Sequence, residues 1–221
     1  MGRSARTSGL DPRVVRTRAA VLEAATTLFL RSGYGGTSMD EIAETAGVSK
    51  RTLYNNYAHK EELFREVVMT ATALAEEFSE RAVIELAHPE DLDAALTTLA
   101  RRLIGQVITP KVVKLRRLLI GEAHRFPNLA GEYYDLAPGR VISTIASSFE
   151  RLAAQGRLRA SDPRRAAEHF AFLVLGAAMD RALFVVHDIP PDPGVLAGAA
   201  DDGVRIFLSA YGEVSHPPDN P

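Results

Sequence analysis

A chain of 221 residues, with 46% hydrophobic and 24% charged residues, has an ordinary globular composition and is long enough to bury a substantial core. The absence of cysteine excludes a disulfide framework, thiol catalysis and zinc–thiolate sites. The formal net charge of −2 is unevenly distributed: residues 1–60 contain nine Lys or Arg and five Asp or Glu, whereas residues 61–221 contain 17 and 23. The first part can therefore contact phosphate groups, which the second part would repel.

Apolar residues recur at helical spacing along the chain, and no segment shows the alternation of a strand. The sequence therefore predicts an all-α protein of about nine to ten helices. In chain order, we expect helices at about 12–32, two short ones within 37–60, and others at about 60–87, 90–109, 111–124, 128–136, 138–155, 163–187 and 201–211.

The segment 37–60 has the signals of a helix-turn-helix. Ser38 and Glu41 have the spacing of a capping box, which starts the first helix. Gly47 stands where a left-handed C-terminal cap is needed, and Ser49 can cap the next helix. Since the second helix of such a motif enters the major groove of DNA, we expect a DNA-binding unit.

The outer surface of this second helix is rich in hydrogen-bond donors, because Leu53 occupies the side that faces the core. The exposed side chains are Lys50, Arg51, Thr52, Tyr54 and Asn55. On a short helix such side chains are usually only solvated. Their place on the outer face of a complete motif, in a basic segment, favours contact with DNA.

A longer string of residues surrounds the motif in uninterrupted register. It consists of Val21, Leu22, Ala24, Ala25, Leu28, Phe29, Gly33, Tyr34, Thr37, Ile42, Ala43, Ala46, Gly47, Val48, Ser49, Thr52, Leu53, Tyr54, Lys60, Glu61 and Leu63. This string resembles the DNA-binding domain of TetR-family transcriptional regulators. The resemblance implies a three-helix N-terminal helix-turn-helix domain, followed by an α-helical ligand-binding and dimerisation domain.

The resemblance also implies roles for individual residues. The implied DNA-binding residues are Thr37, Ser49, Lys50, Arg51, Thr52, Tyr54, Asn55 and Lys60. Thr37 at a helix N-terminus, the Tyr54 hydroxyl and Lys60 would bind phosphates, which position the domain. The candidates for contacts with base edges are Lys50, Arg51, Thr52 and Asn55, with Lys and Arg favouring guanine and Asn favouring adenine.

Three positions depart from the family pattern. Arg51 stands where the family often has a small residue, and it adds either a guanine contact or another phosphate contact. Asn56 and Tyr57 replace the commoner His-Phe pair. Tyr57 can still fill the aromatic core position.

A second group of residues resembles the AefR-like subgroup of the family. It comprises Leu115, Arg116, Arg117, Leu118, Gly121, Glu122, Ala123, Arg125, Phe126, Pro127, Leu129, Ala130, Tyr133 and Tyr134. Family members commonly enclose a small-molecule pocket in this domain, with apolar walls and a few polar anchors. The candidate pocket residues are Phe78, His124, Phe126, Tyr133, Tyr134 and Phe170. Each of them can equally belong to a plain helical core.

Two apolar stripes occupy the later helices, Ile142, Ile145, Phe149 and Leu152 on one and Phe172, Leu175, Gly176, Met179 and Leu183 on the next. In the family, the corresponding helices pair with their copies into a four-helix dimer interface. The candidate interface residues are Ile142, Ile145, Phe149, Phe172, Gly176 and Met179. Packing within the chain is the alternative. A homodimer is favoured because one short recognition helix reads too few bases by itself.

Signals of catalysis and of membrane insertion are missing from the sequence. The 6 histidines show no metal-ligand spacing, and there is no nucleophile elbow, phosphate-binding loop or clear carboxylate pair. We therefore expect no enzymatic activity, no metal and no cofactor. The N-terminus has no apolar secretory segment, and the longest uncharged run, 170–179, is too short to span a bilayer, so we expect a cytoplasmic protein without a membrane partner.

The sequence thus predicts a helix-turn-helix DNA-binding domain at 13–60 and a helical ligand-binding and dimerisation domain at 61–212. A flexible arm at 1–12, either disordered or in contact with DNA, and a disordered tail at 213–221 would flank them. The implied function is a ligand-responsive repressor that binds a near-palindromic operator as a homodimer. Its effector would tilt the helix that begins at Lys60 and move the two recognition helices out of register.

Two alternatives stay open at this point. The first is a DNA-binding regulator with a filled core and no ligand. The second is a helical small-molecule-binding protein or enzyme whose N-terminal helices no longer bind DNA.

Overall fold

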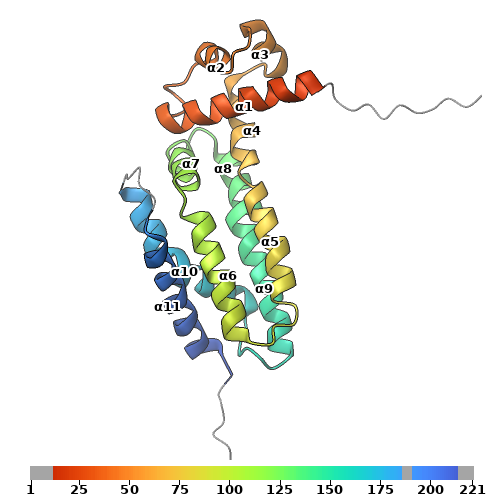
Figure 1. Cartoon of the computed structure of the whole chain (residues 1–221), viewed down its shortest axis with the longest axis vertical. Coiled ribbons are helices and arrows are strands. Elements are labelled where there is room, and N and C mark those ends of the chain that lie inside the picture. The colour runs from red at the N-terminus through yellow and green to blue at the C-terminus, as the bar shows by residue number, and fades with distance from the viewer. Residues whose placement is uncertain (1–11, 186–190, 214–221) are drawn as a thin grey trace, which may run out of the picture. The chain divides into compact units, whose positions relative to one another are not determined.

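The protein, described by a computed structural model over residues 12–185 and 191–213, forms two compact units that divide after Thr70. The predicted arm and tail lie outside the described residues, apart from Pro12 and Glu213. The helices, labelled in Figure 1, are α1 Pro12–Ser32, α2 Met39–Thr45, α3 Lys50–Asn56, α4 Lys60–Thr70, α5 Ala73–Glu85, α6 Leu92–Val107, α7 Pro110–Gly121, α8 Pro127–Tyr134, the π-helical turn η1 Asp135–Gly139, α9 Arg140–Ala154, α10 Pro163–Phe184 and α11 Pro193–Tyr211. The predicted all-α fold class is confirmed.

The helix predicted at 60–87 is in fact two helices, which accounts for the larger number of elements. The Thr70 hydroxyl donates a hydrogen bond to the Glu66 carbonyl at 2.8 Å, a bond of the kind that bends helices. The chain then leaves the helical path at Ala71 and Thr72. Because α4 belongs to the N-terminal unit, the division between units falls after Thr70, whereas the sequence places it after Lys60.

Two other elements differ from the prediction because of how prolines are accommodated. The last helix begins at Pro193 rather than near residue 201, since Asp192 accepts a hydrogen bond from the Gly194 amide at 2.7 Å and a proline is tolerated in the first turn. The helices predicted at 128–136 and 138–155 are joined through η1, whose wide turn contains Pro138.

The N-terminal unit is organised around a cluster of aromatic rings. The ring centroid of Phe64 lies 5.2 Å from that of Phe29 and 5.0 Å from that of Tyr34, both in edge-on geometry. Leu53 of α3 and Tyr57 just after it are buried against the same core. Helix α3 is therefore held by its apolar side, and its opposite side faces solvent.

An ion pair links the first and last helices of this unit. The Arg18 guanidinium donates two hydrogen bonds to the Glu66 carboxylate, at 2.9 and 2.7 Å. These bonds hold the pKa of Glu66 below its usual value. Burial raises the pKa of the neighbouring Tyr57 hydroxyl to about 12, so this side chain stays neutral.

The C-terminal unit is a bundle in which α5, α6 and α9 lie side by side (Figure 1). Helix α10 packs against α9 and α11, and α11 packs against α6. Phe149, Phe170 and Phe207 meet at its centre, with ring centroids 5.1 to 5.7 Å apart. Gly203 of α11 lies against the backbone of α10, because a Cβ atom there would come within 3.1 Å of Leu173.

Candidate nucleic-acid interface and effector cavity

The turn between α2 and α3 has the geometry that its sequence predicts. Gly47 has φ of +67°, a left-handed conformation that favours glycine. The Val48 amide donates to the Ala43 carbonyl at 3.0 Å, and the Gly47 amide donates to Glu44 at 3.1 Å. These two bonds form a Schellman motif, which ends α2 and sets the direction in which α3 begins.

Both helices of the motif are capped by serine. The Ser38 hydroxyl accepts a hydrogen bond from the Glu41 amide, and the Ser49 hydroxyl accepts one from the Thr52 amide, each at 3.1 Å. The Glu41 carboxylate does not point back to the cap, as a capping box requires, but accepts a hydrogen bond from Arg31 at 2.9 Å. The motif is thus fixed by local hydrogen bonds at both helix starts.

Besides Lys50, three of the expected DNA-binding side chains are exposed on α3: Arg51, Tyr54 and Asn55. Tyr54 is 49% exposed, which is high for a large aromatic side chain in a protein with a well-formed core. Within residues 12–185 and 191–213, none of the three makes a side-chain hydrogen bond or ion pair. Their polar groups are therefore available for an external partner.

Other expected DNA-binding residues already have partners inside the motif. The Lys50 ammonium donates to the Asp40 carboxylate at 2.5 Å, and this bond raises the pKa of Lys50. The hydroxyls of Ser49 and Thr52 lie 2.7 Å apart. In the absence of DNA, these side chains are therefore hydrogen-bonded within the motif.

Thr37 and Lys60 are tied to the turn that leads into α2. Thr37 is only 2% exposed, and its hydroxyl donates to the Gly33 carbonyl at 2.8 Å. The Lys60 ammonium donates to the carbonyls of Tyr34 and Thr37 at 2.8 and 2.7 Å, and it lies 4.3 Å from the centroid of the Tyr34 ring. Both side chains therefore have a structural role that the sequence did not indicate.

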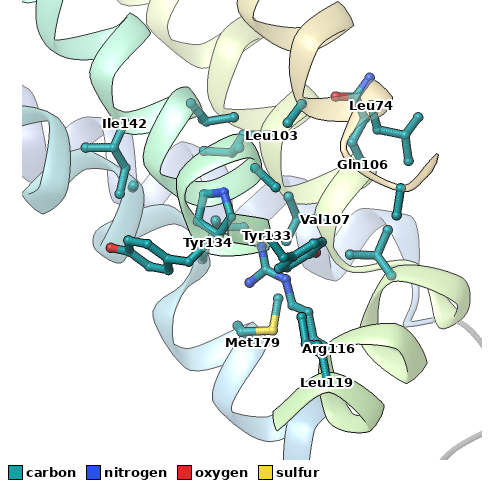
Figure 2. Close-up of a pocket in the computed structure, with 18 of the residues that line it drawn as sticks. Leu74, Leu103, Gln106, Val107, Arg116, Leu119, Tyr133, Tyr134, Ile142 and Met179 are labelled. Atoms are coloured by element: carbon teal, nitrogen blue, oxygen red, sulfur yellow. The ribbon is translucent and has the colours of Figure 1, made fainter. Parts of the chain in front are cut away.

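A cavity of about 530 Å³ lies within the C-terminal unit, between α5, α6, α7, α8, η1, α9 and α10 (Figure 2). Its walls are mostly aliphatic and aromatic, and its volume is in the range of small-molecule sites. Phe78, Tyr133 and Tyr134, which the sequence proposed for a pocket, line it. The turn η1 adds Ala137 and Pro138 to the wall.

The other three proposed pocket residues do not line the cavity. Phe170 is fully buried between Phe149 and Phe207, where it belongs to the central core. His124 is exposed beyond the end of α7, and Phe126 precedes α8. Their proximity in sequence to the tyrosines of α8 made them plausible candidates, but the turn after α7 directs them elsewhere.

The polar residues of the cavity include Gln106, Arg116 and Asp180, which the sequence analysis did not assign to it. Figure 2 shows the guanidinium group of Arg116 directed from α7 toward Tyr133. The buried Nε atom of Arg116 has no hydrogen-bond partner in the described part of the chain. The sequence offers only the pair of adjacent arginines between leucines on a short helix, which does not show which of the two faces the cavity.

The apolar stripe of α9, which the sequence assigns to a dimer interface, faces the interior of its own chain in this structure. Ile145 and Phe149 are fully buried in the core of the chain, and Ile142 lines the cavity. Gly176 and Met179 of α10 also line the cavity. The spacing of apolar residues showed that these faces are buried, but it could not show against what.

Large exposed apolar side chains lie instead on α10, on α11 and just beyond the end of α10. They are Phe172, Leu173, Phe184, Val185, Val195 and Ile206, of which Phe172, Phe184 and Val195 are 72, 78 and 68% exposed. Figure 1 shows α10 and α11 next to each other. Adjacent helices with several exposed apolar side chains are typical of a protein–protein interface.

The described residues hold no candidate metal site and no membrane-spanning helix. In residues 12–185 and 191–213, no cluster of three or more His, Asp or Glu side chains could hold a metal ion. None of the helices described combines the length and the hydrophobicity needed to cross a bilayer.

A complete helix-turn-helix with an exposed outer face, joined in one chain to a helical unit with a cavity, defines a DNA-binding transcriptional regulator. Comparison with known families agrees with this class. Residues 21–67 match the bacterial regulatory proteins of the tetR family. Residues 94–213 match the C-terminal domain of AefR-like transcriptional repressors.

Known relatives resemble the chain over most of its length in structure. A TetR-family regulator from Mesorhizobium loti MAFF303099 is 35% identical, with a TM-score of 0.83, covering 91% of this chain and 100% of that one. The flavonoid-responsive regulator FrrA is 31% identical, with a TM-score of 0.69 and the same coverage of both chains. The transcriptional regulator AcrR of Shigella flexneri is 30% identical over 48% of this chain and 46% of its own length.

The chain belongs to the TetR family of transcriptional regulators, a family of non-enzymatic DNA-binding proteins. It spans less than half the length of the curated relatives that it matches in sequence.

Proposed function

We propose that the protein is a ligand-responsive repressor that binds a near-palindromic operator as a homodimer. The observation that carries the DNA-binding part is the outer face of α3, where Arg51, Tyr54 and Asn55 are exposed and have no partner among the described residues. A helix capped at its start and packed by its apolar side presents these groups with little loss of entropy on binding.

The contacts on this face divide into two kinds. The Tyr54 hydroxyl would bind a phosphate, which positions the domain, and Arg51 and Asn55 would reach base edges, which select the sequence. Lys50 would join them once it leaves Asp40. Lys60 and Thr37 would act mainly by holding the turn before α2, whose first amides can face a phosphate.

Two copies of the chain would read the operator together. One α3 covers only a few base pairs, and two copies related by a two-fold axis would place their recognition helices about 34–36 Å apart. The exposed apolar side chains of α10 and α11 supply a surface for this pairing. Replacing Phe184 and Val195 by aspartate should therefore give a monomer in analytical ultracentrifugation and weaken operator binding.

The cavity of the C-terminal unit supports control by a small molecule. FrrA, to which the chain is similar, is a flavonoid-responsive regulator, and the match to AefR-like repressors favours repression. Occupation of the cavity would shift α5, which lines it with Leu74 and Phe78 and follows α4 after a turn of two residues that adds Ala71 to the wall. Such a shift would change the separation of the recognition helices and release the operator.

A gel shift on the DNA upstream of the protein's own gene, repeated at rising salt, tests the proposal. The wild-type protein should bind, and its affinity should fall steeply with salt. Arg51→Ala should weaken binding strongly, whereas Arg81→Ala, which removes the same charge from exposed α5, should not. If wild-type protein shifts neither this DNA nor random fragments at low salt, the chain does not act as a DNA-binding repressor.

A further inference from the structure

One charged side chain of the cavity has an unusual environment. The Nε atom of Arg116 is buried, and no group in the described part of the chain accepts a hydrogen bond from it. The guanidinium group of an arginine is positively charged, and burying part of it without a hydrogen-bond partner costs free energy. The Nε atom of the neighbouring Arg117 is also buried without a partner, but a terminal nitrogen of that guanidinium donates to the carbonyls of Ala182 and Val185 at the end of α10.

The surroundings of Arg116 are mostly apolar, so the cavity provides little compensation for its charge. The apolar walls include Phe78, Leu103, Leu119 and Met179. Figure 2 shows the guanidinium group of Arg116 directed toward Tyr133, with Leu119 and Met179 nearby in the view. A positive charge at one place in a cavity with mostly apolar walls is matched by a ligand with the opposite charge and an apolar body.

The carboxylate that shares the cavity does not neutralise Arg116. Asp180 also lines the cavity, but it is exposed to solvent, and Arg116 makes no ion pair with it in the described residues. The remaining polar groups, Gln106, Tyr133 and Tyr134, are uncharged donors and acceptors that can orient a ligand without changing its charge preference. An external anion is therefore the group that the site lacks.

We infer that the effector is an amphipathic organic anion, and this inference rests on the proposed function. Its carboxylate or sulfonate group pairs with the guanidinium of Arg116, which can donate two parallel hydrogen bonds to such a group. Its apolar body, aromatic or aliphatic, fills the cavity of about 530 Å³ between α5, α6 and α10. A neutral molecule of the same shape leaves Arg116 without a partner and binds more weakly.

Two fluorescent probes that differ by one charged group test the inference. They are 1-anilinonaphthalene-8-sulfonate and its uncharged analogue N-phenyl-1-naphthylamine, each titrated into the full-length protein. The wild-type protein should bind the sulfonate at least about tenfold more tightly than the neutral probe, since hydrogen bonds to charged groups contribute that much. Arg116→Gln should remove this preference and keep the affinity for the neutral probe within about twofold.

Three variants separate the charge of Arg116 from other effects. Arg116→Lys keeps the charge and should retain part of the preference, and Asp180→Asn should strengthen binding of the sulfonate. Arg81→Gln, which removes an exposed charge outside the cavity, should leave both affinities unchanged. Unchanged binding of the neutral probe to Arg116→Gln also shows that the cavity is intact.

The inference is overturned if the two probes bind equally, if neither binds, or if Arg116→Gln keeps the full preference for the sulfonate. A gel shift without probes is run on the same protein samples. Loss of DNA binding there contradicts the proposed function, whereas a missing charge preference with DNA binding intact contradicts only the nature of the effector.

Discussion

The ammonium group of Lys50, the first residue of α3, lies 2.5 Å from a carboxylate oxygen of Asp40 in α2. This bond crosses the turn of the helix-turn-helix and holds a cationic side chain that would otherwise be free to meet DNA. Both side chains are more than half exposed, so the pair itself contributes little to stability. Its effect should instead be on DNA binding, because Asp40 both competes for Lys50 and repels phosphate.

Asp40→Asn should therefore raise the affinity for the operator several-fold at low salt. A plot of the logarithm of the affinity against the logarithm of the salt concentration should become steeper by about one unit, since one more counterion is released. Fluorescence anisotropy with labelled operator DNA at several salt concentrations measures both quantities. Glu23→Gln removes the same charge from the exposed surface of α1 and serves as the control. Equal affinities for Asp40→Asn and Glu23→Gln would show that the pairing with Lys50 does not restrain DNA binding.

Lys60 is predicted to stabilise the N-terminal unit as well as any DNA complex. Lys60→Met keeps the aliphatic stem but removes the ammonium group that donates to the Tyr34 and Thr37 carbonyls. The free energy of unfolding should therefore fall by about 1–3 kcal/mol. Urea unfolding followed by circular dichroism measures the change. Lys111→Met, on the exposed surface of α7, should have little effect. An equally small effect of Lys60→Met would show that Lys60 does not stabilise the folded unit and acts only through a phosphate contact.

The Arg18–Glu66 pair should make the stability of the protein depend on pH in the acid range. Because the pKa of Glu66 is lowered in the folded state, its contribution is fully present above the unfolded value near 4.5 and is lost as the pH falls through the folded pKa. Glu66→Gln should lower the urea midpoint at pH 7, by an amount equivalent to at most about 1 kcal/mol for this partly exposed pair. The difference from wild type should shrink as the pH is lowered to 3, and a constant difference would exclude the ion pair as its cause.

Gly203 is predicted to be needed for the close packing of α11 on α10. A Cβ atom at this position would lie 3.1 Å from the backbone of Leu173, so Gly203→Ala should force the helices apart and cost about 1–3 kcal/mol. Gly198→Ala on the same helix meets nothing within 4 Å and should stabilise the protein by about 0.5–1 kcal/mol. Thermal unfolding of the two variants should therefore shift in opposite directions, and a shift in the same direction would contradict the packing.

The helix-turn-helix was predictable because its signals are local. Ser38, Gly47 and Ser49 mark the helix ends, and the hydrogen bonds there join residues no more than five positions apart, so the local sequence determines this geometry. The sequence did not indicate which of the exposed side chains pair with one another. The pairing of Lys50 with Asp40, ten residues earlier, depends on the angle between α2 and α3.

The C-terminal unit was predictable in its helices but not in what each helix contacts. The stripe of Ile145 and Phe149 has the same spacing whether it faces its own chain or a copy, and only the tertiary packing of α9 against α5 and α10 decides between them. For the same reason, the residues that line the cavity could be predicted only in part from the sequence. Tyr133 was expected there because it stands in a polar-aromatic segment, whereas Arg116 could be assigned only when α7 was placed against α10.

The proposed reading of DNA sequence by α3, through Arg51 and Asn55, is tested most directly by selection of binding sites from a random DNA pool. The wild-type protein should enrich a consensus with two-fold symmetry, whose half-sites are about 34–36 Å apart. Asn55→Ala should lose the preference at one base pair in each half-site, whereas Arg81→Ala should return the wild-type consensus. Selection of the same consensus by Arg51→Ala and Asn55→Ala, or of no consensus by the wild-type protein, would contradict the account.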